Sequence, residues 1–316
     1  MTKFAIILGE PNSINSEILA KSSAIKKECI IIGSHDLLSK QLELLKIKRK
    51  INKIYDIKDY IRSKKKLNIL DVPLNFKDAF NVNSKNSVNY LRKCFNIAHN
   101  LCLKKKIKGF INCPIDKQRF FKNKELGITE YLASKNKVLG SEVMIIYNKS
   151  LSVVPLTTHI NLRKVPKIIK KNFIITKIRT LNNFYKKYFK VKPKIAILGL
   201  NPHNSEYNKD SEEIKFIKPA VNSLKKRFNV SGPYSADTAF GKAHLKKFNI
   251  IVGMYHDQVL APYKTLYEFN AINMTLGLPY LRMTPDHGVA IDKKKLNISS
   301  ARSLNNCIEV MSRLIK

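Results

Sequence analysis

The stretch KIAILGLNPH, from Lys194 to His203, decides the fold class. Its first half is a run of aliphatic residues, which is typical of a buried strand in a parallel sheet. The run ends at Gly199, and polar residues with a histidine follow within a few positions. A buried strand that ends in polar residues is the pattern of an open α/β sheet, in which ligands bind beyond the carboxyl ends of the strands.

Similar apolar runs recur along the chain and alternate with segments of helical periodicity. The predicted strands are 4–8, 29–32, 68–72, 109–112, 142–147, 151–156, 194–198, 249–253 and 271–275. The predicted helices are 35–47, 88–105, 129–136, 162–188, 212–227 and 300–314. Ser34, Ser87 and Ser211 stand at the starts of three of them as expected N-caps. This alternation predicts an α/β protein with largely parallel strands.

The composition excludes several classes of protein. The chain has 316 residues, of which 44% are hydrophobic, and this apolar fraction excludes a disordered polycation. No apolar run approaches the roughly 18 to 20 residues of a membrane span. The apolar stretch near the N-terminus is too short for a signal peptide, so we expect a cytoplasmic protein of one large domain or two ordinary ones.

The net charge of +36, from 59 Lys and Arg against 23 Asp and Glu, would by itself suggest a nucleic-acid ligand. The excess is mainly lysine, it is spread over the whole chain, and it accompanies abundant Asn and Ile, as an AT-rich coding sequence produces. A protein that reads a nucleic-acid groove more often concentrates arginine on one element. We interpret the charge as a solvated surface, and keep a basic nucleic-acid-binding protein as the alternative of a different class.

Three histidines, His159, His203 and His256, each follow a predicted strand. The carboxyl ends of parallel strands meet at one edge of a sheet, so the three side chains could converge. Neutral imidazoles, together with a neighbouring carboxylate such as Asp257, are suitable ligands for a zinc-like divalent cation. Such a cation would keep coordination positions open for the substrate. Taken singly, a histidine near a strand end is more often a capping or packing residue. His35 also follows a strand and is assigned no role.

Other predicted strand and loop ends are equally polar. Gly232–Thr238 forms a loop with an acid, Asp237, at its mouth, and Lys264, Asn273 and Arg282 occupy predicted loop or strand-end positions after His256. Lysine, arginine and asparagine beside a metal suit a substrate that carries phosphate or carboxylate. No GxGxxG follows the first strand and no GxxxxGK[ST] occurs, which argues against an ordinary Rossmann site or a P-loop.

Ordered motifs over nearly the whole chain resemble the 4-hydroxythreonine-4-phosphate dehydrogenase (PdxA) family of vitamin B6 synthesis. The motifs are Gly9-Glu10-Pro11, Thr157-Thr158-His159 with Leu162-Arg163, Leu200-Asn201-Pro202-His203 with Glu212-Glu213-Ile214, Gly232-Pro233 with Ala236-Asp237-Thr238, Tyr255-His256-Asp257-Gln258, Asn273–Pro279 with Arg282, and Pro285-Asp286-His287-Gly288. The resemblance implies two α/β/α domains with an active-site cleft between them, like isocitrate and isopropylmalate dehydrogenases. Residues 1–135 plus 280–316 would form the first domain, and 136–279 the second.

The resemblance also implies an activity: NAD-dependent and divalent-metal-dependent oxidation of 4-phosphooxy-L-threonine at C3, then decarboxylation to 3-amino-2-oxopropyl phosphate, in pyridoxal 5'-phosphate biosynthesis. It implies a homodimer with the active site at the interface and one zinc, magnesium or cobalt ion per site. The residues so implied are His159, His203 and His256 for the metal, Thr129, Lys264, Asn273 and Arg282 for the substrate, and His287 and Gly288 for the cofactor. Our hypotheses for the chemistry are Asp237 or Asp257 as general base and Lys117 as general acid.

The chain departs from the family pattern at four places. Asn12, Ser13 and Asn15 replace the usual glycines after Pro11, and Ile128 stands where the family often has histidine. The segment after His203 is one residue shorter, and 293–297 lacks the expected glycine. Because Ile128 neighbours an expected substrate residue, a related dehydrogenase of erythronate or threonate 4-phosphate stays open as an alternative.

Overall fold

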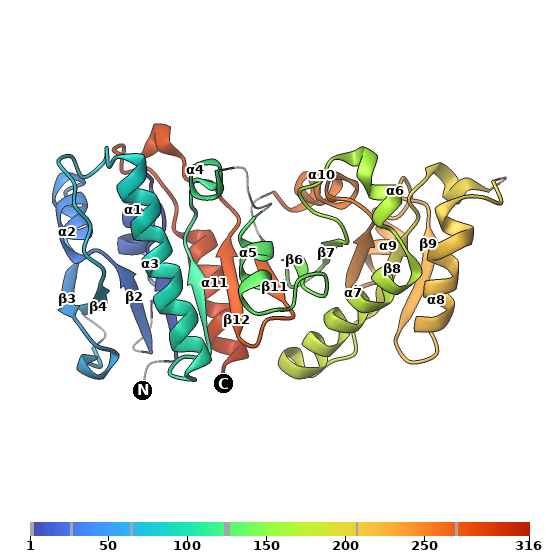
Figure 1. Cartoon of the computed structure of the whole chain (residues 1–316), viewed down its shortest axis with the longest axis horizontal. Coiled ribbons are helices and arrows are strands. Elements are labelled where there is room, and N and C mark those ends of the chain that lie inside the picture. Colours follow the sequence, from blue (N-terminus) through green and yellow to red (C-terminus); the bar gives the residue numbers. More distant parts are fainter. Residues whose placement is uncertain (1–2, 26–27, 64–65, 123–126, 207, 269–270) are drawn as a thin grey trace. The chain divides into compact units, whose positions relative to one another are not determined.

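The structure, a computed structural model, describes residues 3–25, 28–63, 66–122, 127–206, 208–268 and 271–316. The chain divides into two compact units. Unit 1 comprises Met1–Lys124 and Pro279–Lys316, and unit 2 comprises Glu125–Leu278. Each unit consists of β-strands with helices packed against them, which confirms the predicted α/β class (Figure 1).

Unit 1 contains strands in the spatial order β3-β4-β2-β1-β5-β12, and the pairings between them are parallel. The strands are β1 (Phe4–Ile7), β2 (Cys29–Gly33), β3 (Lys50–Ile54), β4 (Lys66–Asp71), β5 (Gly109–Asn112) and β12 (Leu281–Pro285). The helices are α1 (Asn15–Lys21), α2 (His35–Leu44), η1 (Ile57–Asp59), α3 (Ser84–Leu103), α4 (Lys117–Phe121), η6 (Ile291–Lys293) and α11 (Arg302–Leu314). Helix α3 packs on β1, β2 and β5, and α11 packs on β5 and β12.

Unit 2 contains strands in the order β11-β6-β7-β10-β8-β9. They are β6 (Val143–Tyr147), β7 (Ser152–Pro155), β8 (Ile195–Leu198), β9 (Val230–Tyr234), β10 (Ile250–Gly253) and β11 (Ile272–Leu276). The run β7-β10-β8-β9 is parallel, whereas β6 pairs antiparallel with both β7 and β11. The helices are α5 (Ile128–Lys135), η2 (Leu162–Lys164), α6 (Val165–Ile168), α7 (Lys171–Phe184), η3 (Tyr185–Phe189), η4 (Pro202–Ser205), η5 (Glu213–Ile217), α8 (Lys218–Leu224), α9 (Lys242–Leu245) and α10 (His256–Tyr267).

Three strands were not predicted from the sequence. Strand β3 (KINKI) carries two lysines and lies at an edge of the strand order, where charged residues are common. Strand β9 contains Gly232 and Pro233, and it too is an edge strand, the place where a sheet tolerates proline. Strand β12 contains Arg282, which the sequence places at a loop or strand end; its side chain is buried within the strand instead.

Two helix predictions need correction. Helix α3 begins at Ser84 rather than after Ser87, because the side chain of Asn83 accepts a hydrogen bond from Asn86 N and is the N-cap. The helix predicted over 162–188 is interrupted at Ile169, whose backbone is extended and whose side chain is fully buried. The Ser34 cap is confirmed, since its side chain accepts from Leu37 N.

Helix α5 lies in unit 2, whereas the domain boundary expected at residue 135 would place it in the first domain. Its side chains explain the difference. Thr129 Oγ1 lies 3.0 Å from Thr275 Oγ1 on β11, and Thr158 Oγ1 donates to Glu130 Oε1 at 2.6 Å. The first turn of α5 is therefore bonded to the strand ends of unit 2.

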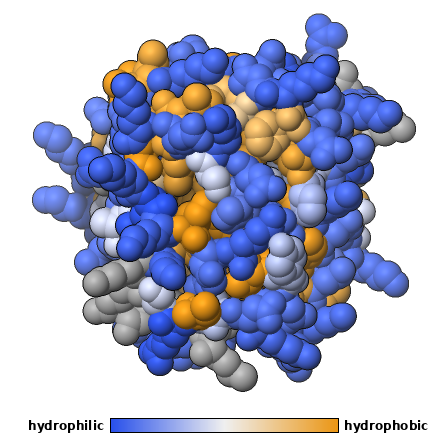
Figure 2. Space-filling view, turned by 90° about the vertical axis from the view of Figure 1, so that its left-hand side faces the viewer, coloured by the Kyte–Doolittle hydropathy of each residue, from blue (hydrophilic) through white to orange (hydrophobic). Residues whose placement is uncertain are grey.

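Hydrophilic residues cover most of one face of unit 1 (Figure 2). Figure 2 shows the β3 side of unit 1, where hydrophilic side chains dominate and apolar ones are interspersed in small groups. None of the helices in the described part of the chain combines the length and the apolarity needed to cross a bilayer.

Candidate functional site

The three candidate metal ligands follow three strands of unit 2 that are parallel and adjacent. His159 follows β7, His256 is the first residue of α10 after β10, and His203 lies in η4 after β8. Strand β10 pairs with β7 on one side and with β8 on the other. The order of the strands therefore carries all three histidines toward the same edge of unit 2.

The structure brings two of these histidines together. The ring centroids of His159 and His256 are 5.6 Å apart. His203 has a left-handed backbone (φ 48°), its side chain is 71% exposed, and its Nδ1 lies 3.8 Å from Asp237 Oδ2. Among the described residues of one chain, no three His, Cys, Asp or Glu side chains form a group that could hold a metal ion.

The loop that carries His203 is fastened by a buried carboxylate, Glu213. Its Oε1 accepts hydrogen bonds from Leu200 N at 2.7 Å and Asn201 N at 2.8 Å, and its Oε2 accepts from Asn201 Nδ2 at 3.0 Å. Burial acts to raise the pKa of Glu213, but these hydrogen bonds outweigh it, so the pKa lies below its usual range. The sequence shows Glu213 only as an acidic residue near a helix start, which hides this anchoring role.

His256 and its neighbours are held by a second set of contacts. His256 Nδ1 lies 2.7 Å from Asp257 Oδ1. Gln258 Oε1 accepts from Met254 N at 2.6 Å, and Gln258 Nε2 donates to Gly199 O at 2.7 Å. Gln258 therefore ties the end of β10 to the end of β8, the two strands that precede His256 and His203.

A pocket of about 220 Å³ lies in unit 2 beside the His159 loop. Its lining includes Thr129, Glu130, Thr158, Glu142 and Lys177. Lys177 is buried, donates to the backbone oxygen of Glu142, and lies 3.2 Å from Glu142 Oε1. Burial lowers the pKa of Lys177, while Glu142 opposes that effect.

The expected substrate residues of unit 2 occupy different environments. Thr129 is buried against Thr275, and Ile128 beside it is also buried. Asn273 lies in β11, and its Oδ1 is buried without a hydrogen-bond partner in the described structure. Lys264 lies on α10, half-buried. Asn273 thus has the feature expected of a ligand-binding side chain, namely an unsatisfied acceptor.

Four of the expected site residues lie in unit 1. Arg282 is only 3% exposed, and its Nε donates to Asn112 Oδ1 at 2.8 Å. Lys117 is exposed at the start of α4. His287 Nδ1 lies 2.9 Å from Gly288 O, and its Nε2 is buried without a hydrogen-bond partner among the described residues. Burial lowers the pKa of His287. A Cβ added at Gly288 would meet nothing within 4 Å, so the backbone there is open to a ligand.

The residues that replace the family's glycines form structural bonds. Asn12 Nδ2 donates to Val82 O at 2.7 Å, and Asn12 Oδ1 accepts from Val82 N at 2.8 Å. Asn15 Nδ2 donates to Pro114 O at 2.9 Å. These side chains brace the loop after β1 from inside unit 1.

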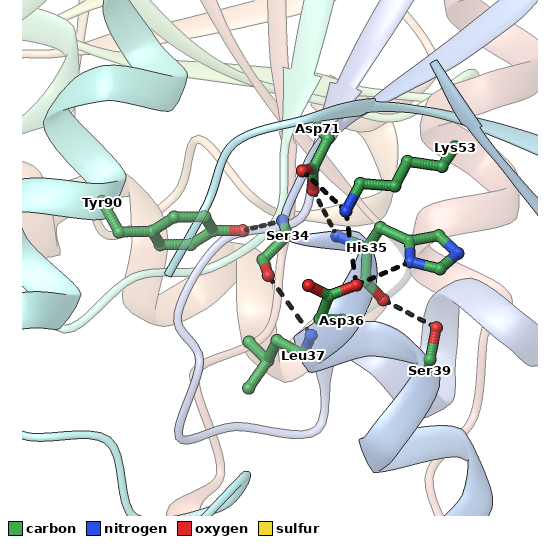
Figure 3. Close-up of polar contacts among 8 residues, drawn as sticks. All are labelled: Ser34, His35, Asp36, Leu37, Ser39, Lys53, Asp71 and Tyr90. Carbon is green, nitrogen blue, oxygen red and sulfur yellow. Dashed lines mark hydrogen bonds and ion pairs between the residues drawn. The ribbon is translucent and has the colours of Figure 1, made fainter. Parts of the chain in front are cut away.

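His35, which also follows a strand, lies in a network of hydrogen bonds and ion pairs at the start of α2. Figure 3 shows the start of α2, where His35 N donates to Asp71 Oδ1 and His35 Nδ1 faces Asp36. Lys53 Nζ lies 3.2 Å from Asp71 and 3.5 Å from Asp36. This network links α2 to β3 and β4.

Comparisons with known proteins match most of the chain to one family. The sequence profile described as "Pyridoxal phosphate biosynthetic protein PdxA" matches residues 25–311. A 4-hydroxythreonine-4-phosphate dehydrogenase from Sulfurihydrogenibium sp. is 40% identical, over 98% of this chain and 97% of its own. A D-threonate 4-phosphate dehydrogenase from Pectobacterium atrosepticum is 30% identical, over 91% of each chain. A solved structure of 4-hydroxythreonine-4-phosphate dehydrogenase from Klebsiella pneumoniae superposes with a TM-score of 0.84, 28% identity and full coverage of both chains.

Proposed function

Because the chain belongs to the PdxA family and is a dehydrogenase, we propose that it oxidises 4-phosphooxy-L-threonine at C3 with NAD and a divalent metal. The β-keto acid formed then loses carbon dioxide and yields 3-amino-2-oxopropyl phosphate, a step of pyridoxal 5'-phosphate biosynthesis in the cytoplasm. The observation that carries this proposal is the pairing of His159 and His256 after adjacent parallel strands, with His203 after the next strand.

The residues fit a metal by their donor chemistry. His159, His203 and His256 would hold the ion, and imidazole donors favour zinc or cobalt over magnesium. The ion would supply Lewis-acid polarisation of the C3 hydroxyl. The exposed His203 suits a site completed at the interface of a homodimer, as in the arrangement that the family resemblance implies.

Acid and base roles follow from the carboxylates near the histidines. Asp257 lies 2.7 Å from His256, within hydrogen-bonding distance of that ring, whereas Asp237 is 3.8 Å from His203, so its carboxylate is open to a proton from substrate. We therefore favour Asp237 over Asp257 as the general base that takes the hydroxyl proton. Lys117, exposed at the start of α4, would return a proton to carbon after decarboxylation.

Substrate and cofactor have separate sets of residues. Thr129, Lys264, Asn273 and Arg282 would bind the polar and anionic groups of the substrate, and the unsatisfied Asn273 Oδ1 supports this assignment. His287 and Gly288 fit a cofactor loop, because His287 Nε2 lacks a partner and the space beside Gly288 is open. NAD bound there would accept the hydride from C3.

One specific observation favours a second substrate. Ile128 is 4% exposed and cannot donate a hydrogen bond, although it precedes Thr129 where the family often has histidine. A relative at 30% identity is a D-threonate 4-phosphate dehydrogenase. Oxidation of threonate or erythronate 4-phosphate is therefore the second candidate function.

The test is NADH formation measured with both phosphorylated acids side by side. We expect turnover of 4-phosphooxy-L-threonine that a chelator abolishes and a divalent ion restores. A higher kcat/KM for the sugar acid would favour the second candidate. Tight duplex DNA binding with a steep salt slope, and no turnover of either acid, would contradict both.

A further inference from the structure

A half-buried carboxylate that the sequence did not single out, Glu130, lies beside the candidate metal ligand His159. Glu130 is on the first turn of α5, and its side chain is 13% exposed. Its Oε1 accepts a hydrogen bond from Thr158 Oγ1 at 2.6 Å and lies 4.0 Å from His159 Nδ1. The carboxylate is thus in contact with the residue before the candidate ligand and faces the ring of the ligand itself.

The other oxygen of Glu130 is unsatisfied. Glu130 Oε2 is buried and has no hydrogen-bond partner in the described structure. A buried carboxylate oxygen without a donor is costly and is kept where it has a role. His159 Nδ1 lies 4.0 Å from Oε1 of the same carboxylate, so a rotation of the imidazole would turn its ring N–H toward the Glu130 side chain.

Gly127 makes room for this arrangement. A Cβ at position 127 would lie 2.9 Å from Glu130 Oε2 and 3.3 Å from His159 Nδ1. Both atoms therefore approach the same point of the backbone, and a larger residue there would push them apart. Gly127, Glu130 and Thr158 form a support for His159, which we call the His159 support.

The other two candidate ligands have the same kind of neighbour. His256 Nδ1 faces Asp257 at 2.7 Å, and His203 Nδ1 faces Asp237 at 3.8 Å. A carboxylate at Nδ1 fixes the ring so that Nε2 is the atom directed to a metal, and it raises the basicity of that nitrogen. The two aspartates are exposed, whereas Glu130 is shielded from water, so its effect on its histidine is screened least.

We propose that Glu130 is a positioning residue that holds His159 with Nδ1–H toward its carboxylate and Nε2 toward a bound divalent metal. This inference rests on the metal site of the proposed function and adds the group that sets the tautomer of one ligand. Thr158 fixes Glu130 Oε1, and Gly127 allows the close approach.

The test compares the full-length wild type with Glu130→Gln. Glutamine keeps an oxygen acceptor for Thr158 but presents an NH2 group to His159, which favours the opposite tautomer. Cobalt affinity is measured by visible absorbance titration, and the His159 tautomer by long-range proton–nitrogen NMR of the metal-free protein. We expect affinity about 10-fold to 100-fold weaker in the variant, and loss of the Nδ1–H tautomer at His159.

Glu142→Gln is the matched control, because Glu142 is another buried carboxylate of the same pocket but pairs with Lys177 rather than with a histidine. We expect it to lower thermal stability and to leave cobalt affinity within about twofold. If Glu130→Gln cannot be purified, Thr158→Val takes its place, with an expected affinity loss of about threefold to tenfold from a less firmly held carboxylate.

The outcomes separate the two proposals. A wild type that binds no cobalt through its histidines contradicts the proposed metal site itself. A wild type that binds cobalt, with Glu130→Gln or its substitute binding equally well and showing an unchanged His159 tautomer, overturns the role of Glu130 and leaves the metal site standing.

Discussion

Two strand ends, one in each unit, have nearly the same sequence and different surroundings. Strand β2 ends in glycine and leads into His35-Asp36 at the start of α2, and β10 ends in glycine and leads into His256-Asp257 at the start of α10. In both, the histidine Nδ1 faces the next aspartate, at 2.9 Å and 2.7 Å. The local motif is therefore the same, and it cannot by itself identify a ligand.

The two strand ends differ in the side chains that their neighbouring strands contribute. Beside β2, strands β3 and β4 contribute Lys53 and Asp71, which complete a closed ionic network around the start of α2 (Figure 3). Beside β10, strand β7 leads into His159, whose ring lies 5.6 Å from that of His256. His35 therefore lies beside ion pairs that connect three elements of unit 1, whereas His256 lies beside a second imidazole.

The largest expected effect is on activity, and it distinguishes the two histidines when each is replaced by alanine. We expect His256→Ala to lower kcat/KM by about 10³-fold or more, because it removes a metal ligand. We expect His35→Ala to leave kcat/KM within about twofold. Steady-state NADH formation with 4-phosphooxy-L-threonine measures both, and comparable losses in the two variants would remove the distinction between the strand ends.

The next effect concerns Glu213, the carboxylate that fastens the His203 loop. We expect Glu213→Gln to lower the free energy of unfolding at neutral pH by about 2 to 4 kcal/mol, because buried backbone donors lose a charged acceptor. The folded-state pKa of Glu213 is depressed, so its stabilisation is present above the ordinary glutamate pKa and is lost as the pH falls through the folded-state value. Urea unfolding at a series of pH values measures this.

The gap in stability between wild type and Glu213→Gln should therefore narrow at acidic pH. A gap that stays constant from neutral pH to about pH 3 would show that the Glu213 charge is not what holds the loop.

A smaller loss of stability is expected from removing Asp71, which accepts a backbone hydrogen bond in unit 1 as Glu213 does in unit 2. Asp71→Ala removes one backbone acceptor and one ion-pair partner of Lys53. We expect it to cost about 1 to 2 kcal/mol of unfolding free energy, with cobalt affinity unchanged. Weakened cobalt binding in this variant would mean that the closed network in unit 1 also serves the metal site.

The smallest effect is expected from Ile128→His, which restores a potential donor in the first turn of α5. We expect KM for 4-phosphooxy-L-threonine to fall by about threefold to tenfold, with some loss of melting temperature because Ile128 is buried. Kinetics with threonate 4-phosphate in parallel provide the control. An equal change for both substrates would exclude position 128 as a determinant of preference.

The sequence was sufficient for the fold class and for the family, because apolar runs and ordered motifs depend on short stretches of chain. The strands it missed are those in which local composition opposes a strand: lysines in β3, Gly232 and Pro233 in β9, and Arg282 in β12. In each case the pairing with a neighbouring strand outweighs local preference.

For the candidate site, the sequence led to the histidines but not to the groups that hold them. Glu130 and Glu213 are distant in the chain from the residues to which they bond near the candidate ligands, Glu130 by 28 residues from Thr158 and Glu213 by 13 from Leu200. Nothing in their local sequence distinguishes them from acidic residues at helix starts. The sequence also does not show that Arg282 is buried, because its hydrogen-bond partner Asn112 lies on another strand, β5, far away in the chain.

The hydrogen bonds of Gln258 couple two turns that are far apart in the sequence. Gln258 spans Met254 and Gly199, so the turns after β10 and β8 reach their final shape only once these two strands have paired. Such pairing joins segments about fifty residues apart in the chain. The turn that carries His256 and the turn that precedes His203 are therefore shaped by a contact that only the folded chain makes, and a shift in one of them is passed to the other through Gln258.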